Sequence, residues 1–308
     1  MAETSPRRAH GPSLEQAPLG SRPTALILSG GAALGSWQGG VLHELCARRG
    51  WSLHSVLGTS AGSVNAAAYY QDGLEALREA WRDVPRRSFL RPRPRLFPPS
   101  LFAQAPVRAF LARFIDEERA RARGRCWLYV VSADIRDGGL FQASFSPAAG
   151  GGRWDGPLVD CVLGSVAVPY LFPPVELAAG AAGPRARLLV DGHLLSFADL
   201  RPLASRGARD FVFVTVVGRH APRVPRLSPR GFTSALVGEL LRAQVHNALA
   251  ALDGPGEEHG LRFFELDPLE PLKMGVFAFD REECRRSFDQ GTRDAQEFLS
   301  RPADFRIE

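Results

Sequence analysis

Short apolar runs that end in glycine loops and lead into helical patterns predict an α/β domain. Ala25–Leu28 is such a run, and after its glycine loop the apolar residues recur at helical spacing through 35–49. The same order follows at once, because Ser55–Leu57 enters a second glycine loop and the alanine-rich stretch 63–70 comes next. Two consecutive strand–loop–helix units predict a mainly parallel sheet.

The remaining pattern continues with strands and helices around one proline-rich break. Prolines interrupt residues 85–99, where arginines alternate with Phe and Leu, and this predicts either a solvated connector or a flap that faces an anionic lipid surface. We expect a three-layer α/β/α domain over residues 23–300, after a disordered N-terminal tail at 1–22 and before a C-terminal tail at 301–308. Further strands are expected at 127–131, 140–145, 188–190, 211–217 and 263–266, and further helices at 74–84, 106–115, 158–168, 232–252 and 280–299.

The amino-acid composition excludes few classes of protein. A chain of 308 residues that is 45% hydrophobic can bury a large core, and a net charge of +5 is compatible with an anionic membrane without requiring one. The four cysteines lack metal-binding spacing and favour a reducing compartment. Neither a signal-peptide core nor a membrane-spanning apolar run is present. A cytoplasmic location is therefore the default expectation, and peripheral membrane contact stays open. The charge alone does not decide between a membrane, a nucleic acid and no specific partner, and the oligomeric state is unknown.

The strongest chemical signal is the sequence G-T-S-A-G at 58–62. In the pattern G-x-S-x-G, a serine lies on a sharp turn between a strand and a helix, and Ser60 stands between an apolar run and an alanine-rich stretch. The helix that begins after Ser60 directs its positive end toward developing negative charge. An ordinary glycine turn is the alternative, and the strand and helix on either side make it the weaker one.

The earlier glycine loop, S-G-G-A-A-L-G at 29–35, has three competing interpretations. A phosphate loop would need a lysine, which Leu34-Gly35-Ser36 lacks. A dinucleotide fingerprint would need a glycine in place of Ala32 and an acidic residue after the next strand. An oxyanion hole needs only backbone N–H groups beside a nucleophile. Since Ser60 supplies a nucleophile, we favour the oxyanion hole.

A third signal is V-D-G at 190–192, at the end of an apolar run. A carboxylate at a strand end can reach the loop of a neighbouring strand, which makes Asp191 a candidate base. Taken alone, an Asp-Gly pair is more often a simple turn.

Together, these segments resemble the patatin-like phospholipase family. The resemblance rests on L-S-G-G-A-A-L-G-S-W-Q-G-G-V-L-H-E-L at 28–45, G-T-S-A-G-S-V-N-A at 58–66, S-V-A-V-P-Y-L-F-P-P-V at 165–175 and V-D-G-H-L-L-S at 190–196. It extends over roughly residues 24–300. Four segments in the family's order are far more specific than any one of them.

This resemblance implies a lipid acyl hydrolase, such as a phospholipase A, a lysophospholipase or another carboxylic ester hydrolase. Ser60 would be the nucleophile, Asp191 the proton acceptor without an intervening histidine, and an acyl-enzyme the intermediate. Phospholipids or other acyl lipids would be the substrates, no nucleic-acid partner is expected, and neither metal nor cofactor is implied. The backbone of Gly30, Gly31 and Ala32 would hold the oxyanion, and the remaining motif residues are Gly35, Gly58, Gly62 and Gly192.

Two positions depart from the family's pattern. Ala32 stands where a third glycine is usual, and it is strained if its φ is positive. His193 stands where Gly or Ala is usual after Asp-Gly, and its ring could narrow the site or take part in it. These departures motivate one alternative, a catalytically silent lipid-binding protein of the same fold.

The other alternative is an α/β-hydrolase with a Ser–His–Asp triad. Its chain order also places the serine before the acid and the histidine last. The early position of Ser60 argues against it, since that fold normally places several strands before its serine. The candidate histidines are His193, His220, His246 and His259.

Overall fold

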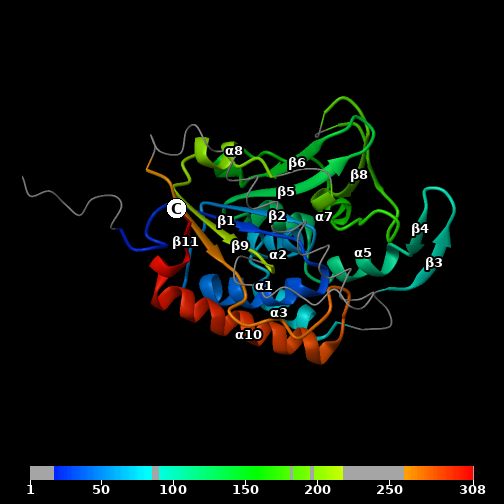
Figure 1. The fold of residues 1–308 in the computed structure, drawn as a ribbon. Helices are drawn as coiled ribbons and strands as arrows, with labels where there is room; N and C mark the ends of the chain where they lie inside the picture. The colour runs from blue at the N-terminus through cyan, green and yellow to red at the C-terminus, as the bar shows by residue number, and fades with distance from the viewer. Residues whose placement is uncertain (1–16, 85–89, 181–182, 195–197, 218–259, 308) are drawn as a thin grey trace, which may run out of the picture.

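A sheet of nine strands forms the centre of the part of the chain that the computed structural model describes, residues 17–84, 90–180, 183–194, 198–217 and 260–307 (Figure 1). Its order is β11-β10-β9-β1-β2-β5-β8-β7, and β6 pairs with β5. The run β10-β9-β1-β2-β5 is parallel throughout, which confirms the expected mainly parallel sheet. The strands are β1 (Thr24–Leu28), β2 (Ser55–Thr59), β5 (Trp127–Asp134), β6 (Leu140–Phe145), β7 (Val175–Leu177), β8 (Arg187–Asp191), β9 (Asp210–Val214), β10 (Arg262–Leu266) and β11 (Arg306–Ile307).

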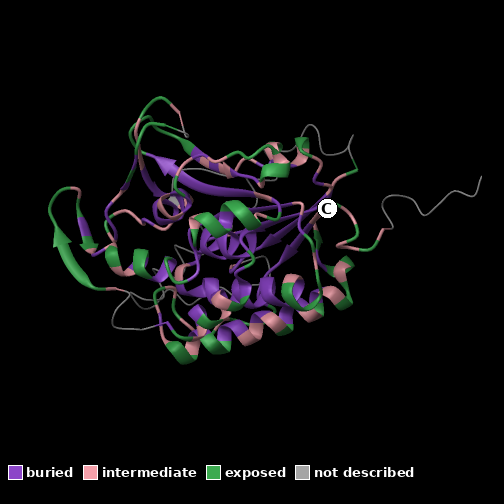
Figure 2. Cartoon of the chain, turned by 180° about the vertical axis from the view of Figure 1, so that it is seen from behind, coloured by how far each residue is buried: buried purple, intermediate pink, exposed green. Residues whose placement is uncertain are grey.

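Alternating side chains of the central strands divide the core between the two faces of the sheet. Leu26 and Leu28 of β1 belong to the larger hydrophobic cluster, whereas Ala25 and Ile27 belong to a smaller one on the opposite face. Helices α1, α2, α3, α7 and α10 cover the larger cluster, and α8 packs on the smaller one, so the three-layer α/β/α architecture is confirmed (Figures 1 and 2). The helices are α1 (Gly35–Leu42), α2 (Ala61–Tyr70), α3 (Leu74–Arg82), α5 (Ala105–Leu111), α6 (Glu117–Arg123), α7 (Leu158–Ser165), α8 (Arg201–Ser205) and α10 (Arg281–Ser300).

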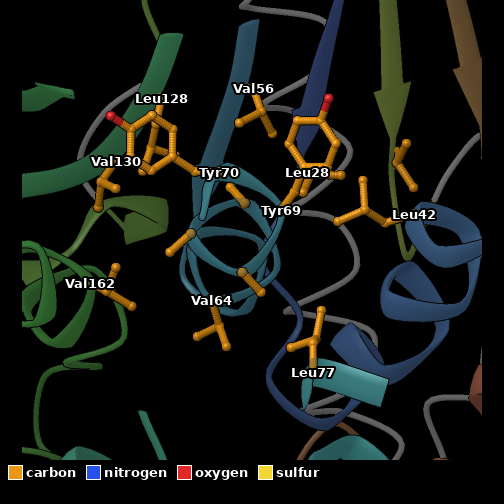
Figure 3. Close-up of a cluster of buried hydrophobic side chains, with 14 of the residues drawn as sticks. Leu28, Leu42, Val56, Val64, Tyr69, Tyr70, Leu77, Leu128, Val130 and Val162 are labelled. Carbon is orange, nitrogen blue, oxygen red and sulfur yellow. The ribbon is translucent and has the colours of Figure 1, made fainter. Parts of the chain in front are cut away.

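Helix α2, which follows Ser60, is buried along its whole length. It packs on β1, β2 and β5 and is surrounded by α1, α3 and α7, so small side chains suit the faces where these elements approach most closely. This explains its alanine-rich sequence and the absence of a polar face. Figure 3 shows this packing, with Leu28, Val56, Leu128 and Val130 from the sheet and Leu42, Leu77 and Val162 from the surrounding helices.

Helices α1 and α10 cross at two glycines. A Cβ added to Gly40 would overlap with the carbonyl oxygen of Phe288, and one added to Gly291 would overlap with the carbonyl oxygen of Trp37. The side chains on either side of the crossing join the helices further, since Trp37 Nε1 donates a hydrogen bond of 2.8 Å to Asp294. Because backbone rather than a flexible side chain fills each space, the two helices cannot accommodate a methyl group without moving apart.

We therefore expect Gly291→Ala to lower the free energy of unfolding by about 3 kcal/mol, although alanine is the better helix former by about 1 kcal/mol. Urea unfolding followed by circular dichroism measures the change. Gly275→Ala is the matched control, because its added Cβ would meet no atom closer than 3.8 Å. Equal unfolding midpoints for the two variants would contradict the close helix crossing.

The described domain extends beyond the expected range 23–300. Leu19 packs against the larger cluster, Phe305 is buried, and Arg306–Ile307 pairs with β10 as β11. The expected strand at 211–217 is β9, which ends earlier, at Val214. The expected helix at 232–252 lies outside the described residues, as do 1–16 of the expected tail.

The described part of the proline-rich stretch is non-helical, as expected, and it forms a β-hairpin. Strands β3 (Pro92–Arg95) and β4 (Ser100–Phe102) pair antiparallel and stand at the side of the molecule, away from the main sheet (Figure 1). Leu101 and Phe102 donate backbone hydrogen bonds to the carbonyls of Tyr170 and Leu171. The hairpin is thus joined to the loop that follows α7.

Candidate active site

Ser60 lies on a strained turn between β2 and α2. Its φ of 52° and ψ of −126° are unusual for a residue with a side chain, and such strain is typical of catalytic turns. A Cβ on Gly62 would overlap with the carbonyl oxygen of Leu28, and one on Gly58 would overlap with that of Gly62. Both glycines of the motif are therefore required by close backbone packing, which presses the turn against the end of β1.

The sheet topology brings Asp191 to this turn. Strand β6 occupies one edge of β5, so β2 and β8 share the other edge. They run in opposite directions and meet at their carboxyl ends, because Thr59 of β2 pairs with Val131 of β5, and Asp191 of β8 pairs with Ser132, the next residue. Ser60 directly follows Thr59. The last residue of β8 and the serine of the turn are thereby neighbours.

Asp191 is buried, with a relative exposure of 2%, and two hydrogen bonds hold it in place. Its backbone N–H donates to the carbonyl of Ala167, and its Oδ1 accepts a 2.9 Å hydrogen bond from the backbone N–H of His193. The Nδ1 atom of the His193 ring lies 3.6 Å from the same oxygen. Leu189, two residues earlier on β8, belongs to the larger cluster, so the carboxylate points to the face that carries α2 and α7.

The first glycine loop presents its backbone to the same place. The N–H of Gly30 donates a 2.8 Å hydrogen bond to Nε2 of His193. Among the described residues, the N–H groups of Gly31 and Ala32 have no hydrogen-bond partner. Ala32 has a φ of 48°, so the alanine in place of the third glycine is in the left-handed region, which costs about 1 kcal/mol.

The ring of His193 lies between this loop and the candidate base. A Cβ built on Gly30 would lie 2.6 Å from His193 Nδ1 and 2.8 Å from the Cβ of Ser60, so ring and serine border the same small space. Because Nε2 accepts from Gly30, the ring proton of the neutral form is on Nδ1, the atom that faces Asp191. In the sequence, His193 was identifiable as a departure from the family's pattern, but its hydrogen bond to Gly30 was not. The other candidate histidines, His220, His246 and His259, lie outside the described residues.

Ser165, at the end of α7, anchors the serine turn and was not recognised as a site residue from the sequence. Its Oγ accepts a 2.9 Å hydrogen bond from the backbone N–H of Ser60 and donates a 2.6 Å hydrogen bond to the carbonyl of Val131. The side chain is fully buried. The only feature of the sequence that could have indicated this role is the position of Ser165 at the start of the S-V-A-V-P segment.

Ser165→Ala should leave the N–H of Ser60 buried without a partner, which costs about 1–3 kcal/mol of stability. Because the turn also loses its anchor, we expect ester turnover to fall by about tenfold or more. Urea unfolding and hydrolysis of a soluble ester measure the two effects. Ser205→Ala, at an exposed serine, is the control. Parental turnover in Ser165→Ala would show that the anchor is dispensable.

An apolar pocket opens beside Ser60. Side chains of α2, α3 and α5, the loop after α7 and residues 277–279 line it, and Ser60 contributes the polar group. The cavity volume is about 50 Å³. This is too small for a long acyl chain, so the walls must move apart to admit one. The wall residues are Ala32, Ala61, Val64, Trp81, Leu90, Val107, Phe110, Leu111, Val166, Val168, Phe172, Phe277 and Phe279.

The described residues contain neither a metal site nor a membrane-spanning helix. No cluster of three or more His, Cys, Asp or Glu side chains in this part of the chain is arranged to hold a metal ion. None of the described helices combines the length and apolar character needed to cross a bilayer.

A mainly parallel sheet between helical layers, with glycine loops at the ends of β1 and β2, is the architecture expected of a patatin-like α/β protein. The sequence profile described as Patatin-like phospholipase matches residues 26–204, and the chain belongs to this family. The crystal structure of VipD from Legionella pneumophila is similar, with a TM-score of 0.40 and 14% identity over 91% of this chain and 67% of VipD. That likeness is too low to bear on the site. A comparison with curated protein sequences finds no match.

Proposed function

We propose that this chain is a serine lipid acyl hydrolase in which Ser60 is the nucleophile and Asp191 the base. Its family implies hydrolysis of acyl lipids. The observation that carries the assignment of residues is the meeting of β2 and β8 on one edge of β5, which makes a strained serine and a buried carboxylate neighbours. The apolar pocket that Ser60 borders supports an acyl chain as the bound group.

In the first half of the reaction, Ser60 Oγ attacks the ester carbonyl carbon while its proton passes to the Asp191 carboxylate. The tetrahedral intermediate then collapses, the bond to the alcohol oxygen breaks, and Asp191 returns the proton to that oxygen. In the second half, water attacks the acyl-enzyme and gives a proton to Asp191. The fatty acid leaves as the bond to Oγ breaks, and Ser60 regains its proton.

The oxyanion of both tetrahedral intermediates would be held by backbone N–H groups of the first glycine loop. Gly31 and Ala32 have N–H groups without a partner among the described residues, and Ala32 borders the pocket together with Ser60. Gly30 can donate only after the ring of His193 gives up its hydrogen bond. The positive end of α2, which begins at Ala61, adds to the stabilisation.

A second candidate mechanism passes the proton through His193. It is favoured by the position of His193 Nδ1, which lies 3.6 Å from Asp191 Oδ1 and would need a small shift to form the acid–histidine hydrogen bond of a triad. To complete the triad, Nε2 would have to leave Gly30 and accept the proton of Ser60. We prefer the direct dyad, because Nε2 is already occupied.

Release of fatty acid tests the proposed function. Purified protein is incubated with p-nitrophenyl esters and with vesicles of phospholipid or lysophospholipid, and free acid is measured. We expect release from at least one of these, abolished by Ser60→Ala. If the folded protein releases acid from none of them, the proposed enzyme activity is wrong and the chain is a catalytically silent lipid-binding protein.

A further inference from the structure

The tip of the β3–β4 hairpin exposes two large apolar side chains. Leu96 is 98% and Phe97 89% exposed, the highest values among the large hydrophobic side chains described as exposed. Figures 1 and 2 both show the hairpin projecting from the side of the domain, and in Figure 2 it is almost wholly exposed. Two adjacent and almost fully exposed apolar side chains on a projecting tip form an apolar patch of the kind that marks an interaction site.

Basic side chains flank this tip without acidic neighbours in sequence. Arg91, Arg93 and Arg95 are exposed, and residues 84–115 contain no Asp or Glu. None of these arginines forms an ion pair with another described residue. An apolar tip framed by positive charge that no described residue pairs is complementary to a bilayer with anionic headgroups, where arginines bind phosphates and the apolar side chains enter the acyl boundary.

The base of the hairpin belongs to the pocket of Ser60. Leu90, at the start of the hairpin, lines that pocket, and Phe102, at its end, packs against Phe172 of the pocket wall with ring centroids 6.0 Å apart. The backbone bond from Phe102 to the carbonyl of Leu171 joins β4 to the same wall. The hairpin is thus joined at its base to the wall of the pocket beside Ser60.

We propose that the β3–β4 hairpin docks the protein on the surface of an anionic phospholipid bilayer, with Leu96 and Phe97 inserted and the three arginines at the headgroups. That this surface supplies the substrate rests on the proposed function, but docking does not. A nucleic acid would engage the arginines and leave the apolar pair without a role. Leu96 and Phe97 are thus the residues that favour a bilayer.

Vesicle binding without turnover tests the docking. Protein carrying Ser60→Ala is sedimented with phosphatidylcholine vesicles with and without phosphatidylserine. We expect binding to the anionic vesicles, weakened at least about tenfold when both tip residues are changed to Asp or all three arginines to Gln. The matched controls change exposed residues elsewhere and should bind like the parent: Ile135→Asp with Leu140→Asp, and Arg285→Gln with Arg286→Gln and Arg293→Gln.

The same hairpin substitutions on an intact Ser60 should leave hydrolysis of a soluble p-nitrophenyl ester unchanged, which also shows that the variants fold. Equal binding by hairpin variants and controls, or equal binding to neutral and anionic vesicles, would overturn the proposal. Loss of binding in the hairpin variants supports docking even if no ester is hydrolysed, in which case only the proposed function fails.

Discussion

Ser60→Ala is expected to lower kcat/KM for a soluble ester by about 10⁴- to 10⁶-fold, the loss that follows removal of a catalytic serine. The fold should persist, because the Oγ of Ser60 makes no hydrogen bond to another described residue. Hydrolysis of a p-nitrophenyl ester and urea unfolding, measured on the same preparation, separate the two properties.

Ser63→Ala is the matched control for this change. Ser63 lies one turn further along α2, and its Oγ donates a 2.6 Å hydrogen bond to the carbonyl of Ser60. Its loss should cost some stability but leave a nucleophile in place, so the variant should still hydrolyse the ester. Activity that persists in a folded Ser60→Ala protein would remove Ser60 from the mechanism.

Asp191→Asn is expected to lower kcat by about 10²- to 10⁴-fold, the usual contribution of a positioned general base. An amide keeps the shape of the side chain and its acceptor for the N–H of His193, but it cannot take the proton of Ser60. Ester hydrolysis over a range of pH measures the loss.

His193→Ala separates the dyad from the triad. In the dyad, this variant should lose less than about tenfold in kcat. Removing the ring also frees the N–H of Gly30 as an oxyanion donor. A loss as large as that of Asp191→Asn would make His193 the base and Asp191 its partner.

Much of this fold was predictable because its signals are local. The apolar runs of β1 and β2, the glycine loops after them and the buried helix α2 are each specified by adjacent residues. The glycines around Ser60 also have a local cause, since Gly58 and Gly62 allow the turn to pack against itself and the end of β1. These segments correspond to the strongest motifs.

The arrangement of the site was less predictable because it depends on distant pairing. The sequence indicated a strand before Asp191, but not that β8 runs antiparallel to β5 and meets β2 end to end. The bond between Gly30 and His193 joins residues 163 positions apart, and no local pattern announces it. Ser165 was likewise missed, because a serine near a helix end has many ordinary roles.

Labelling with a fluorophosphonate probe, followed by mass spectrometry of the peptides, tests the central claim most directly, because the probe forms a covalent bond only with an activated serine. The account predicts one adduct on Ser60, absent in Ser60→Ala and formed more slowly in Asp191→Asn. An adduct on another serine, or no adduct on the folded parent protein, would contradict it.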